Sequence, residues 1–305
     1  MNVIETSGLA KRYGRTWALR GCTLAIPGGH VVALVGPNGA GKTTLMSLAV
    51  GLNRPTAGAV TVLGGEPAGS PIALDQIAFV AQDAPLYRNL SVADMLHVAR
   101  NLNQCWDASR ARVRLTELGI PLTKRVGELS GGQQAQLALT ISLARRPGLL
   151  VLDEPLAMLD PLARHDFMAS LMAAVAEDGV SVVMSSHVLA ELERIADYLV
   201  MLSAGQVQVA GEVDDLLASH QTLTGPASET DKCAERMCVV QCRRAGAQAH
   251  LLVRTTTPPD PAPPGWEAHP VTLEELVLAY LREPGAAALP GPAPVDTHHK
   301  SEVQA

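Results

Sequence analysis

The chain has 305 residues, which is enough for one large folded body or two modest ones. Its composition, 47% hydrophobic and 18% charged, is that of a soluble globular protein, and its net charge of -6 argues against a general nucleic-acid-binding protein. No apolar run reaches the roughly 18 residues that a bilayer-spanning helix needs, and the first residues lack the pattern of a signal peptide. We therefore expect a cytosolic chain that acts at a membrane only through another polypeptide.

The pattern up to residue 217 is typical of an α/β protein. Residues 3–14 and 17–29 have the pattern of antiparallel strands at a sheet edge. After them, apolar strand-like runs precede helical patterns: 30–35 before 42–52, 148–153 before 161–176, and 180–186 before 188–195. This repetition predicts a parallel sheet. Between residues 84 and 146 the pattern changes to helices alone, at 92–102, 108–118 and 133–146, which predicts a helical subdomain inserted in the sheet domain.

The composition changes after residue 217, where prolines accumulate. Residues 238–255 have the pattern of a hairpin that turns at Ala245 and Gly246. Residues 257–266, TPPDPAPPGW, predict a stiff linker, and residues 271–283 predict a helix capped by Thr272 with Glu275 at the third helical position. We expect residues 218–283 to form an accessory region and 284–305 a disordered tail.

The five cysteines indicate reduced thiols, because an odd number in a chain of this length does not suggest a disulfide framework. Cys233, Cys238 and Cys242 cluster ahead of His250, so a zinc site is one interpretation. Their spacing fits no usual zinc pattern, and Cys238 and Cys242 fall on one face of a period-2 strand. Buried strand thiols are therefore the favoured alternative.

The stretch GPNGAGKTT lies between an apolar strand pattern and a helical pattern and matches G-x-x-x-x-G-K-T. Its glycines allow backbone N–H groups to turn inward around a polyphosphate, and the following helix presents its positive end. Lys42 supplies a full charge for the β- and γ-phosphates, and Thr43 can hold Mg²⁺. The stretch therefore predicts a nucleotide site formed by Gly36, Pro37, Asn38, Gly39, Ala40, Gly41, Lys42, Thr43 and Thr44.

Two further segments carry the same chemistry. The strand LLVLDEP ends in Asp153 and Glu154, which lie on opposite sides of its tip. One of the two carboxylates can therefore help to hold Mg²⁺, while the other can interact with a water near the γ-phosphate. The segment LSGGQ places a capping serine and two glycines before an amphipathic helix, which makes a second anion-binding helix end from Ser130, Gly131, Gly132 and Gln133.

These motifs, in this order, resemble those of the nucleotide-binding subunit of ABC transporters over roughly residues 3–217. GPNGAGKTT resembles Walker A, LSGGQ the signature motif, and Asp153 with Glu154 Walker B. The resemblance extends to an adenine-stacking aromatic, the Q-loop, the D-loop and the switch histidine, which are matched by Tyr13, Gln82, Asp160 and His187. Trp17 is an alternative stacking residue, Tyr13 and Gln82 could be ordinary strand residues, and no role is assigned to Asp83.

The family resemblance implies a P-loop NTPase core with a parallel sheet, an antiparallel β edge subdomain and an inserted helical subdomain, followed by a small C-terminal α+β appendage. Residues 1–217 would be the ATP-binding domain, with the helical subdomain at about 84–146. In the family, each ATP lies between Walker A of one copy and LSGGQ of another. Glu154 would then be the general base, His187 would align the water and γ-phosphate, and Ser130 with Gly132 would contact that phosphate. Asp153, Thr43 and Gln82 would organise Mg²⁺.

The resemblance also implies partners: a second copy of this chain or a related ATPase subunit, and an integral membrane permease at the cytoplasmic face of the cell membrane. A groove around residues 85–92 would receive a coupling helix of the permease. The segment TLEELVLAYLRE resembles the terminal segment of drug and polysaccharide exporter ATPases, which favours export. A soluble ABC ATPase acting on ribosomes or DNA is the alternative, although no second cassette, basic linker or coiled-coil arm is visible. The resemblance implies that the membrane subunit selects the transported substrate.

Overall fold

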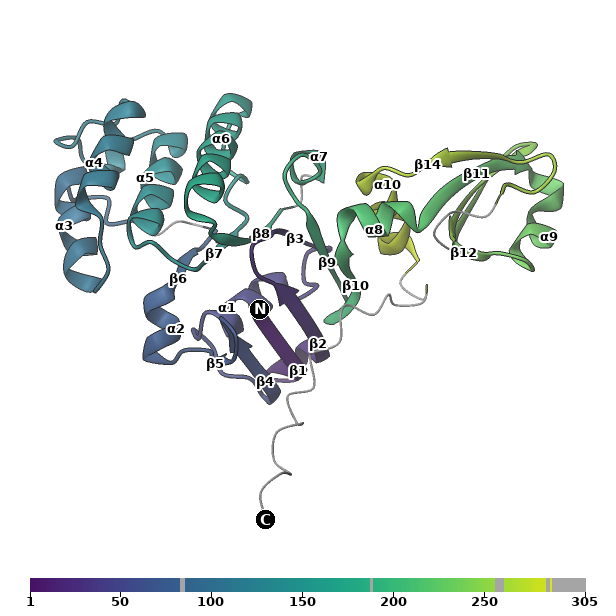
Figure 1. The fold of residues 1–305 in the computed structure, drawn as a ribbon, viewed down its shortest axis with the longest axis horizontal. Helices are drawn as coiled ribbons and strands as arrows, with labels where there is room; N and C mark the ends of the chain where they lie inside the picture. Colours follow the sequence, from purple (N-terminus) through teal and green to yellow (C-terminus); the bar gives the residue numbers. More distant parts are fainter. Residues whose placement is uncertain (83–85, 187–188, 256–260, 284–285, 287–305) are drawn as a thin grey trace, which may run out of the picture.

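The computed structural model describes residues 1–82, 86–186, 189–255, 261–283 and 286. Among them, a six-stranded sheet forms the centre, in the order β10-β9-β3-β8-β7-β6, with all neighbours parallel except β10 and β9 (Figure 1). Strands β3, β7 and β8 are buried along their whole length, because helices or a second sheet cover both faces. The bounds are β3 Val31–Val35, β6 Ile77–Val80, β7 Leu149–Asp153, β8 Ser181–Ser185, β9 Tyr198–Ser203 and β10 Gln206–Glu212.

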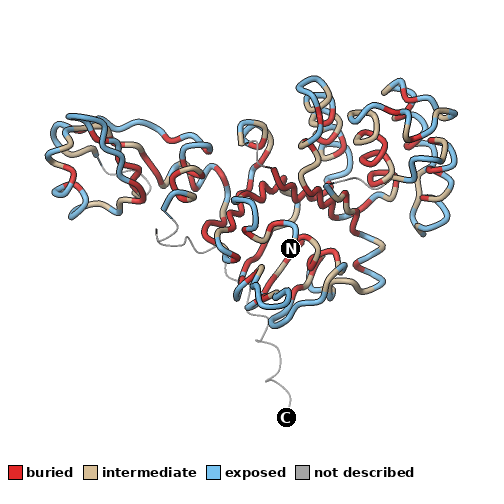
Figure 2. Tube along the Cα trace, turned by 180° about the vertical axis from the view of Figure 1, so that it is seen from behind, coloured by how far each residue is buried: buried red, intermediate tan, exposed pale blue. Residues whose placement is uncertain are grey.

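Alternate side chains of the central sheet face two different cores. Val32 and Leu34 of β3 pack with helix α1 (Lys42–Ala49) and with an antiparallel sheet of order β2-β1-β4-β5. That sheet consists of β1 Asn2–Tyr13, β2 Thr16–Pro27, β4 Ala57–Val62 and β5 Glu66–Pro67, and the short helix α2 (Pro71–Gln76) precedes β6. Val31, Ala33 and Val35 face the other side, toward α5 (Gly131–Ala144) and α6 (Pro161–Asp178). Buried residues follow the sheet through the middle of the molecule in Figure 2.

The helical insertion lies between β6 and β7 and has its own core. It contains α3 (Val92–Leu102), α4 (Ala108–Glu117), the 3-10 turn Val126–Glu128 and α5 (Gly131–Ala144). Leu137 of α5 packs in this core, whereas Leu139 packs in the main core, so α5 joins the two. The three predicted helices of this segment are confirmed to within a few residues.

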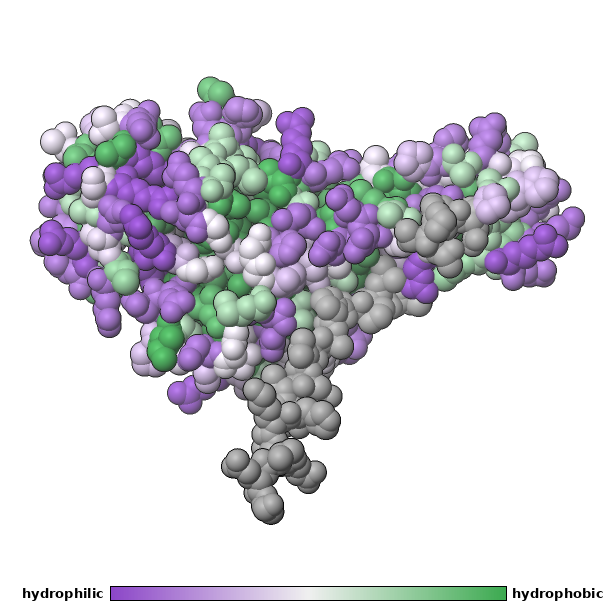
Figure 3. Space-filling view, in the orientation of Figure 1, coloured by the Kyte–Doolittle hydropathy of each residue, from purple (hydrophilic) through white to green (hydrophobic). Residues whose placement is uncertain are grey.

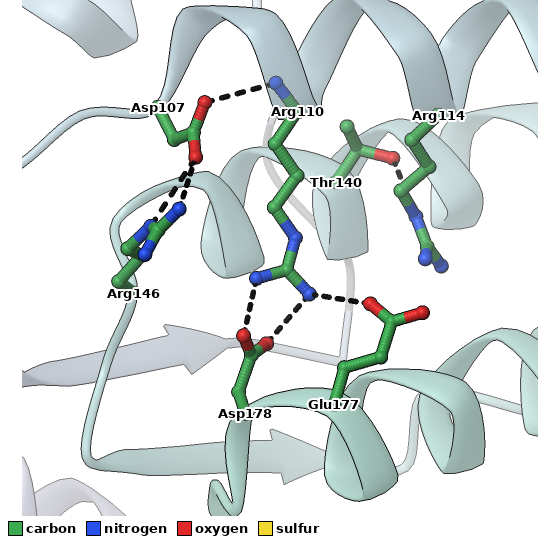
Figure 4. Close-up of polar contacts among 7 residues, drawn as sticks. All are labelled: Asp107, Arg110, Arg114, Thr140, Arg146, Glu177 and Asp178. Atoms are coloured by element: carbon green, nitrogen blue, oxygen red, sulfur yellow. Dashed lines mark hydrogen bonds and ion pairs between the residues drawn. The ribbon is translucent and has the colours of Figure 1, made fainter.

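Ion pairs fix the helical insertion to α6 (Pro161–Asp178), as Figure 4 shows. The Arg110 guanidinium on α4 donates from Nη1 to Asp178 Oδ1 at 2.6 Å, at the end of α6. This hydrogen bond is the main cause that raises the pKa of Arg110 above its ordinary value. Arg146 donates to Asp107 Oδ2 at 2.6 Å, which joins the end of α5 to the start of α4. Two separate contacts therefore orient α4.

After the short helix α7 (Leu189–Leu192) and strands β9 and β10, the C-terminal part forms its own sheet within the described residues, in the order β12-β13-β11-β14. The hairpin and the capped helix are confirmed: Gly246 turns at a φ of 63°, and Thr272 and Glu275 form a capping box. The elements are α8 Val213–Ala218, β11 His220–Pro226, the 3-10 turn Ala227–Glu229, α9 Thr230–Ala234, β12 Cys238–Ala245, β13 Gln248–Arg254, β14 Glu267–Pro270 and α10 Leu273–Arg282.

The predicted linker at 257–266 is wrong at its end. Trp266 is buried in the core beneath the C-terminal sheet, where its ring lies against the α-carbon of Gly225, and β14 begins directly after it. Burial of the large indole ring explains the ordering of a segment whose composition suggested only stiffness. Residues 257–260 of this stretch lie outside the described residues, as do those of the predicted tail except Ala286.

The prediction of buried strand thiols is wrong for Cys238 and Cys242, which are exposed. Cys233 is buried, but it lies on α9 and not on a strand. A register shift between Val239 and Gln241 places an extra residue in β12, so the period-2 alternation does not run through Val240. Within the described residues no group of histidine, cysteine and acidic side chains is arranged to hold a metal, so the zinc interpretation has no support there.

The helices of the described residues are each too short or too polar to cross a bilayer.

Candidate functional site

The phosphate loop joins β3 to α1 at the carboxyl edge of the central sheet. A Cβ on Gly36 would overlap the carbonyl oxygen of Leu202, and one on Gly41 would lie 2.6 Å from that of Ala18, so the backbone is confined. Lys42 is 6% exposed, and its ammonium donates to the carbonyl of Gly36 at 2.8 Å. The loop thus surrounds a single buried cation, an arrangement that fits a polyphosphate.

The two acids of β7 are linked by a serine of the neighbouring strand. Asp153 is 2% exposed and pairs in register with Ser185 of β8. The Ser185 hydroxyl donates to Asp153 Oδ1 at 2.8 Å and accepts from the Glu154 amide at 2.8 Å. Glu154 has a φ of 47°, an uncommon conformation for a residue other than glycine. Ser185 therefore holds the acid pair in position, a role that the sequence did not indicate because only His187 was singled out among residues 185–187.

Asp153 carries the feature expected of a cation ligand. It is buried, and no arginine, lysine or histidine forms an ion pair with it within the described part of the chain. An unpaired carboxylate in a protein interior is costly unless a metal or ligand compensates its charge. The exposed hydroxyl-bearing residue Thr43 lies in the first turn of α1, at the same sheet edge. These oxygens fit a hard divalent cation such as Mg²⁺.

Gln82 lies beside Glu154, because Val80 of β6 pairs with Leu152 of β7 and each of the two residues lies two positions after its member of that pair. Gln82, Glu154, Gly131 and Gln134 are among the residues that line one cavity of about 190 Å³. The structure therefore brings together the predicted Q-loop residue, the predicted base and the start of α5. His187, the predicted switch histidine, and Asp83 lie outside the described residues.

The start of α5 has the predicted capped geometry. The Ser130 hydroxyl accepts from the amide of Gln133 at 3.2 Å, and the Gln133 side chain accepts from the Ser130 amide at 3.2 Å. A Cβ on Gly132 would lie 2.8 Å from that of Ala163, so this glycine permits close packing of α5 on α6. Asp160 caps α6 by accepting from the Ala163 amide at 2.9 Å. A structural role thus accounts for Asp160 in this chain, whatever its role at the nucleotide.

Helices α1 and α5 cover opposite faces of the central sheet. Leu45 and Met46 of α1 pack in one core, and Ala138 and Leu139 of α5 pack in the other. Figure 1 shows the two helices on either side of the sheet. The two helix starts that the sequence predicts to bind anions therefore belong to different layers of the fold.

Both candidate stacking aromatics are accessible at the β1–β2 hairpin. Tyr13 is 48% exposed and Trp17 is 38% exposed, and each ring has a cation over it, Lys11 at 5.1 Å and Arg12 at 5.5 Å. Trp17 is adjacent to Ala18, whose carbonyl lies against Gly41 of the phosphate loop. The geometry keeps both residues as candidates.

The comparisons with known proteins agree with this geometry. The family model described as ABC transporter matches residues 19–157. The chain is 34% identical over 237 residues to an ABC transporter ATP-binding protein of a Nostoc species, covering 72% of this chain and 70% of that protein. The chain belongs to the ATP-binding proteins of ABC transporters. Membership of this ATP-binding family implies ATP hydrolysis.

Import and export proteins of the ABC family are both similar to this chain. A sulfate/thiosulfate import ATP-binding protein of Chromobacterium violaceum is 36% identical, over 71% of this chain and 60% of that protein. A Nod factor export ATP-binding protein of a Rhizobium species is 33% identical, over 71% of this chain and 73% of that protein. The chain thus spans less than two thirds of the first of these proteins.

Solved ABC structures confirm the predicted P-loop α/β fold. An ATP-binding subunit of an ABC transporter superposes with a TM-score of 0.63 at 28% identity, over 70% of this chain and 91% of that one. A bacterial ABC transporter cassette solved as a dimer superposes with a TM-score of 0.61 at 24% identity, over 69% of this chain and 98% of that one. At this identity the second likeness concerns the fold alone.

Proposed function

We propose that this chain is the ATP-hydrolysing subunit of an exporter whose membrane-spanning subunit is a separate polypeptide. The observation that carries the proposal is the chain of contacts at the sheet edge: Ser185 joins Asp153 to Glu154, while Lys42 occupies the neighbouring loop. Residues 1–217 act as the ATPase domain and 218–283 as an accessory region.

The proposed roles follow from chemistry and position. Lys42 and the amides of Gly39, Ala40 and Gly41 bind the phosphates, and Asp153, Thr43 and Gln82 hold Mg²⁺, which neutralises phosphate charge when bound. Glu154 accepts the proton of the attacking water, and His187 orients that water. Positioning and charge stabilisation supply most of the catalysis in phosphoryl transfer, so loss of these side chains lowers turnover.

Two copies are needed for one complete site. Lys42 and Ser130 stand on helices that cover opposite faces of one sheet, which favours contact of Ser130 and Gly132 with a nucleotide held by another copy. A cassette of similar fold was solved as a dimer, which agrees with two copies acting together. The partner copy is either identical or a related subunit.

The coupling surface is proposed at the helical insertion. A cavity of about 430 Å³ lies there, lined by Tyr87, Leu90 and Val98 among others, and Tyr87 is 63% exposed. It suits an amphipathic helix of the membrane subunit. Pro85, at the start of the predicted groove, lies outside the described residues.

Export is favoured over import by two observations. The segment 272–283, which resembles the terminal segment of exporter ATPases, forms the predicted capped helix, and one similar relative is a Nod factor export protein. The import relative supports the opposite direction, so transport itself must be measured. The assay is efflux and drug susceptibility in cells that coexpress this chain with the adjacent membrane gene; net uptake would contradict export.

Complementation tests the shared site. Lys42→Ala and Ser130→Ala are each expected to lose ATP hydrolysis, but a mixed dimer retains one site with both an intact lysine and an intact serine. Mixing the two variants should therefore restore phosphate release. The matched control is a mixture of each single variant with the Lys42→Ala, Ser130→Ala double variant, which leaves no intact site. Full activity of Ser130→Ala alone, or no restoration in the mixture, would refute the shared site.

The trapped state gives a second readout. Glu154→Gln should bind ATP without hydrolysing it, and should elute as a dimer in size-exclusion chromatography with Mg-ATP and as a monomer without it. The control is Glu117→Gln, at the end of α4 and remote from the sheet edge. A Glu154→Gln variant that hydrolyses ATP at the wild-type rate would remove Glu154 from the proposed role.

A further inference from the structure

A cavity of about 510 Å³ lies in the C-terminal part, away from the nucleotide site, between the C-terminal sheet and α10. Its volume is within the range of small-molecule sites. In Figure 3 hydrophilic side chains gather at the end of the molecule that this sheet forms. The proposed ATPase mechanism uses none of the residues that line the cavity.

The strand register builds one wall of the cavity. Thr222, Leu252 and Gln241 lie side by side across β11, β13 and β12, and two positions further along the strands His250 lies beside Arg243. Because side chains alternate along a strand, these residues share one face of the sheet. The intervening residues, such as Leu251, pack in the core on the other face. One face of this sheet is thus apolar, and the other carries polar and cationic groups.

Helix α10 supplies the opposite wall. Glu275, Leu278, Ala279 and Arg282 line the cavity, and their spacing of three, four and seven residues places them on one stripe of the helix. Leu278 and Ala279 with Leu252 of the sheet give the cavity an apolar surface, while Arg282 lies at one end of the stripe. The walls therefore combine apolar and cationic groups.

The charge of the walls favours an anion. Arg243 and Arg282 have no ion pair within the residues that the structure describes, whereas Arg244 pairs with Asp231 at 2.9 Å. Glu275 is an acid of the lining, and its Oε2 accepts the Thr272 amide at 3.1 Å in the capping box. Two guanidinium groups, each able to bind a carboxylate or phosphate with two hydrogen bonds, thus remain available.

Gln241 adds a neutral polar group to the cavity lining. Its side chain is among the cavity-lining groups, and the residue is only 8% exposed. Across the described ranges no hydrogen bond involves its side-chain amide. Neither atom of this amide is among the fully buried side-chain atoms that lack a partner, so the amide faces the open space of the cavity. A polar atom of a molecule in the cavity can therefore bond to it without displacing a protein contact.

We propose that this cavity binds a small amphipathic organic anion. Its carboxylate or phosphate contacts Arg243 and Arg282, a polar atom bonds to the Gln241 amide, and its apolar body packs on Leu252 and Leu278. A charged head alone would leave the apolar surface uncovered, and an uncharged apolar molecule would leave the two guanidinium groups unpaired.

The experiment uses the full chain, because α10 is held to the ATPase body: the Gln208 amide donates to the Tyr280 carbonyl at 3.0 Å, and Glu193 accepts the Leu273 amide at 3.0 Å. The probes are 2-naphthoate and 2-naphthyl phosphate, which share an apolar body and distinguish a carboxylate from a phosphate. Neutral 2-naphthamide is the matched control ligand. Binding is measured by isothermal titration calorimetry without nucleotide.

At least one anionic probe should bind with a stoichiometry of one per chain and at least tenfold more tightly than the amide. Arg243→Gln with Arg282→Gln should weaken that binding at least tenfold, which is about 1.4 kcal/mol. Arg236→Gln, an exposed arginine of the same part of the chain outside the cavity lining, should leave it unchanged. Thermal unfolding checks that all variants are folded.

Gln241→Leu is the second test, because it fills the same space without the amide. It should keep the fold and weaken the binding of the anionic probe. The proposal is overturned if neither anionic probe binds up to its solubility limit, if 2-naphthamide binds as tightly, or if the double arginine variant binds the probe like the wild type.

Discussion

Replacement of Ser185 by alanine tests whether this buried serine positions the acid pair. Ser185 is 0% exposed, and its hydroxyl is shared between the Asp153 carboxylate and the Glu154 amide. Alanine keeps the strand and its packing but removes both hydrogen bonds. The effect of the change is therefore confined to the polar contacts at the end of β7.

The size of the effect follows from those two contacts. A hydrogen bond to a charged group contributes about 1.5–3 kcal/mol and a neutral one about 0.5–1.5 kcal/mol, so their loss destabilises the fold by about 2–4 kcal/mol. Glu154 also has a positive φ, a conformation that costs about 1–3 kcal/mol and persists only where its surroundings hold it. Without the amide contact the backbone relaxes, and we expect kcat to fall at least tenfold.

The assay is steady-state phosphate release at saturating Mg-ATP, with the folded fraction checked by circular dichroism and stability by urea unfolding. Ser181→Ala is the matched control, since Ser181 is 4% exposed at the other end of the same strand and accepts the Gly29 amide at 2.8 Å. It should lose about 1 kcal/mol of stability and keep its kcat. If Ser185→Ala matches Ser181→Ala in both measurements, Ser185 does not position the acids.

Three further predictions follow from burial and space. Gly36→Ala should weaken ATP binding at least tenfold in an equilibrium titration, because its Cβ overlaps the Leu202 carbonyl oxygen. Gly39→Ala has open space around its Cβ and should weaken binding less. Equal losses of affinity in the two variants would contradict this prediction. Burial lowers the pKa of His220, so as pH falls the imidazole is protonated in the unfolded chain before it is protonated in the folded one. The stability that neutral His220 contributes is therefore lost as pH falls below the ordinary histidine pKa of about 6.5. The melting temperature should therefore drop less between pH 8 and acidic pH in His220→Gln than in the wild type, and an identical drop would refute the assignment. Thiol labelling without denaturant should be slow at the buried Cys22 and Cys233, where burial also raises the thiol pKa. It should be fast at the exposed cysteines, which are Cys105, Cys238 and Cys242. Rapid labelling of all five would contradict the burial pattern.

The elements predicted correctly are those with a strong local cause. Continuous apolar runs such as 149–153 form strands buried on both faces, and the capping pair Thr272 and Glu275 starts α10 where predicted. The hairpin at Gly246 has the positive φ that its glycine allows. In each case the residues that determine the structure lie within a few positions of one another, so the pattern alone is sufficient.

Strands β4, β9 and β10 were not predicted although their patterns are local, whereas the errors in the C-terminal part involve contacts between distant segments. Strands β11 and β14, with the polar sequences HQTLTGP and EAHP, were not predicted, since they are strands only through pairing with each other and with β13. Trp266 belongs to a core whose other members lie on β11, α9 and β13. The exposure of Cys238 and Cys242 depends on a register shift against β13. None of these partners can be identified from local periodicity.

By itself, the sequence determined which segments make up the proposed ATP site, because the predicted phosphate loop, the acid pair and the capped LSGGQ helix are each continuous segments with a local pattern. Only the tertiary structure decided how those segments meet. Parallel pairing of β7 with β8 places Ser185 against Asp153 and Glu154, which lie some thirty residues earlier in the chain. In the folded chain, α1 and α5 also pack on opposite faces of the central sheet. Alternation along a strand says that two faces exist, but strand order and crossovers determine which helix covers each one.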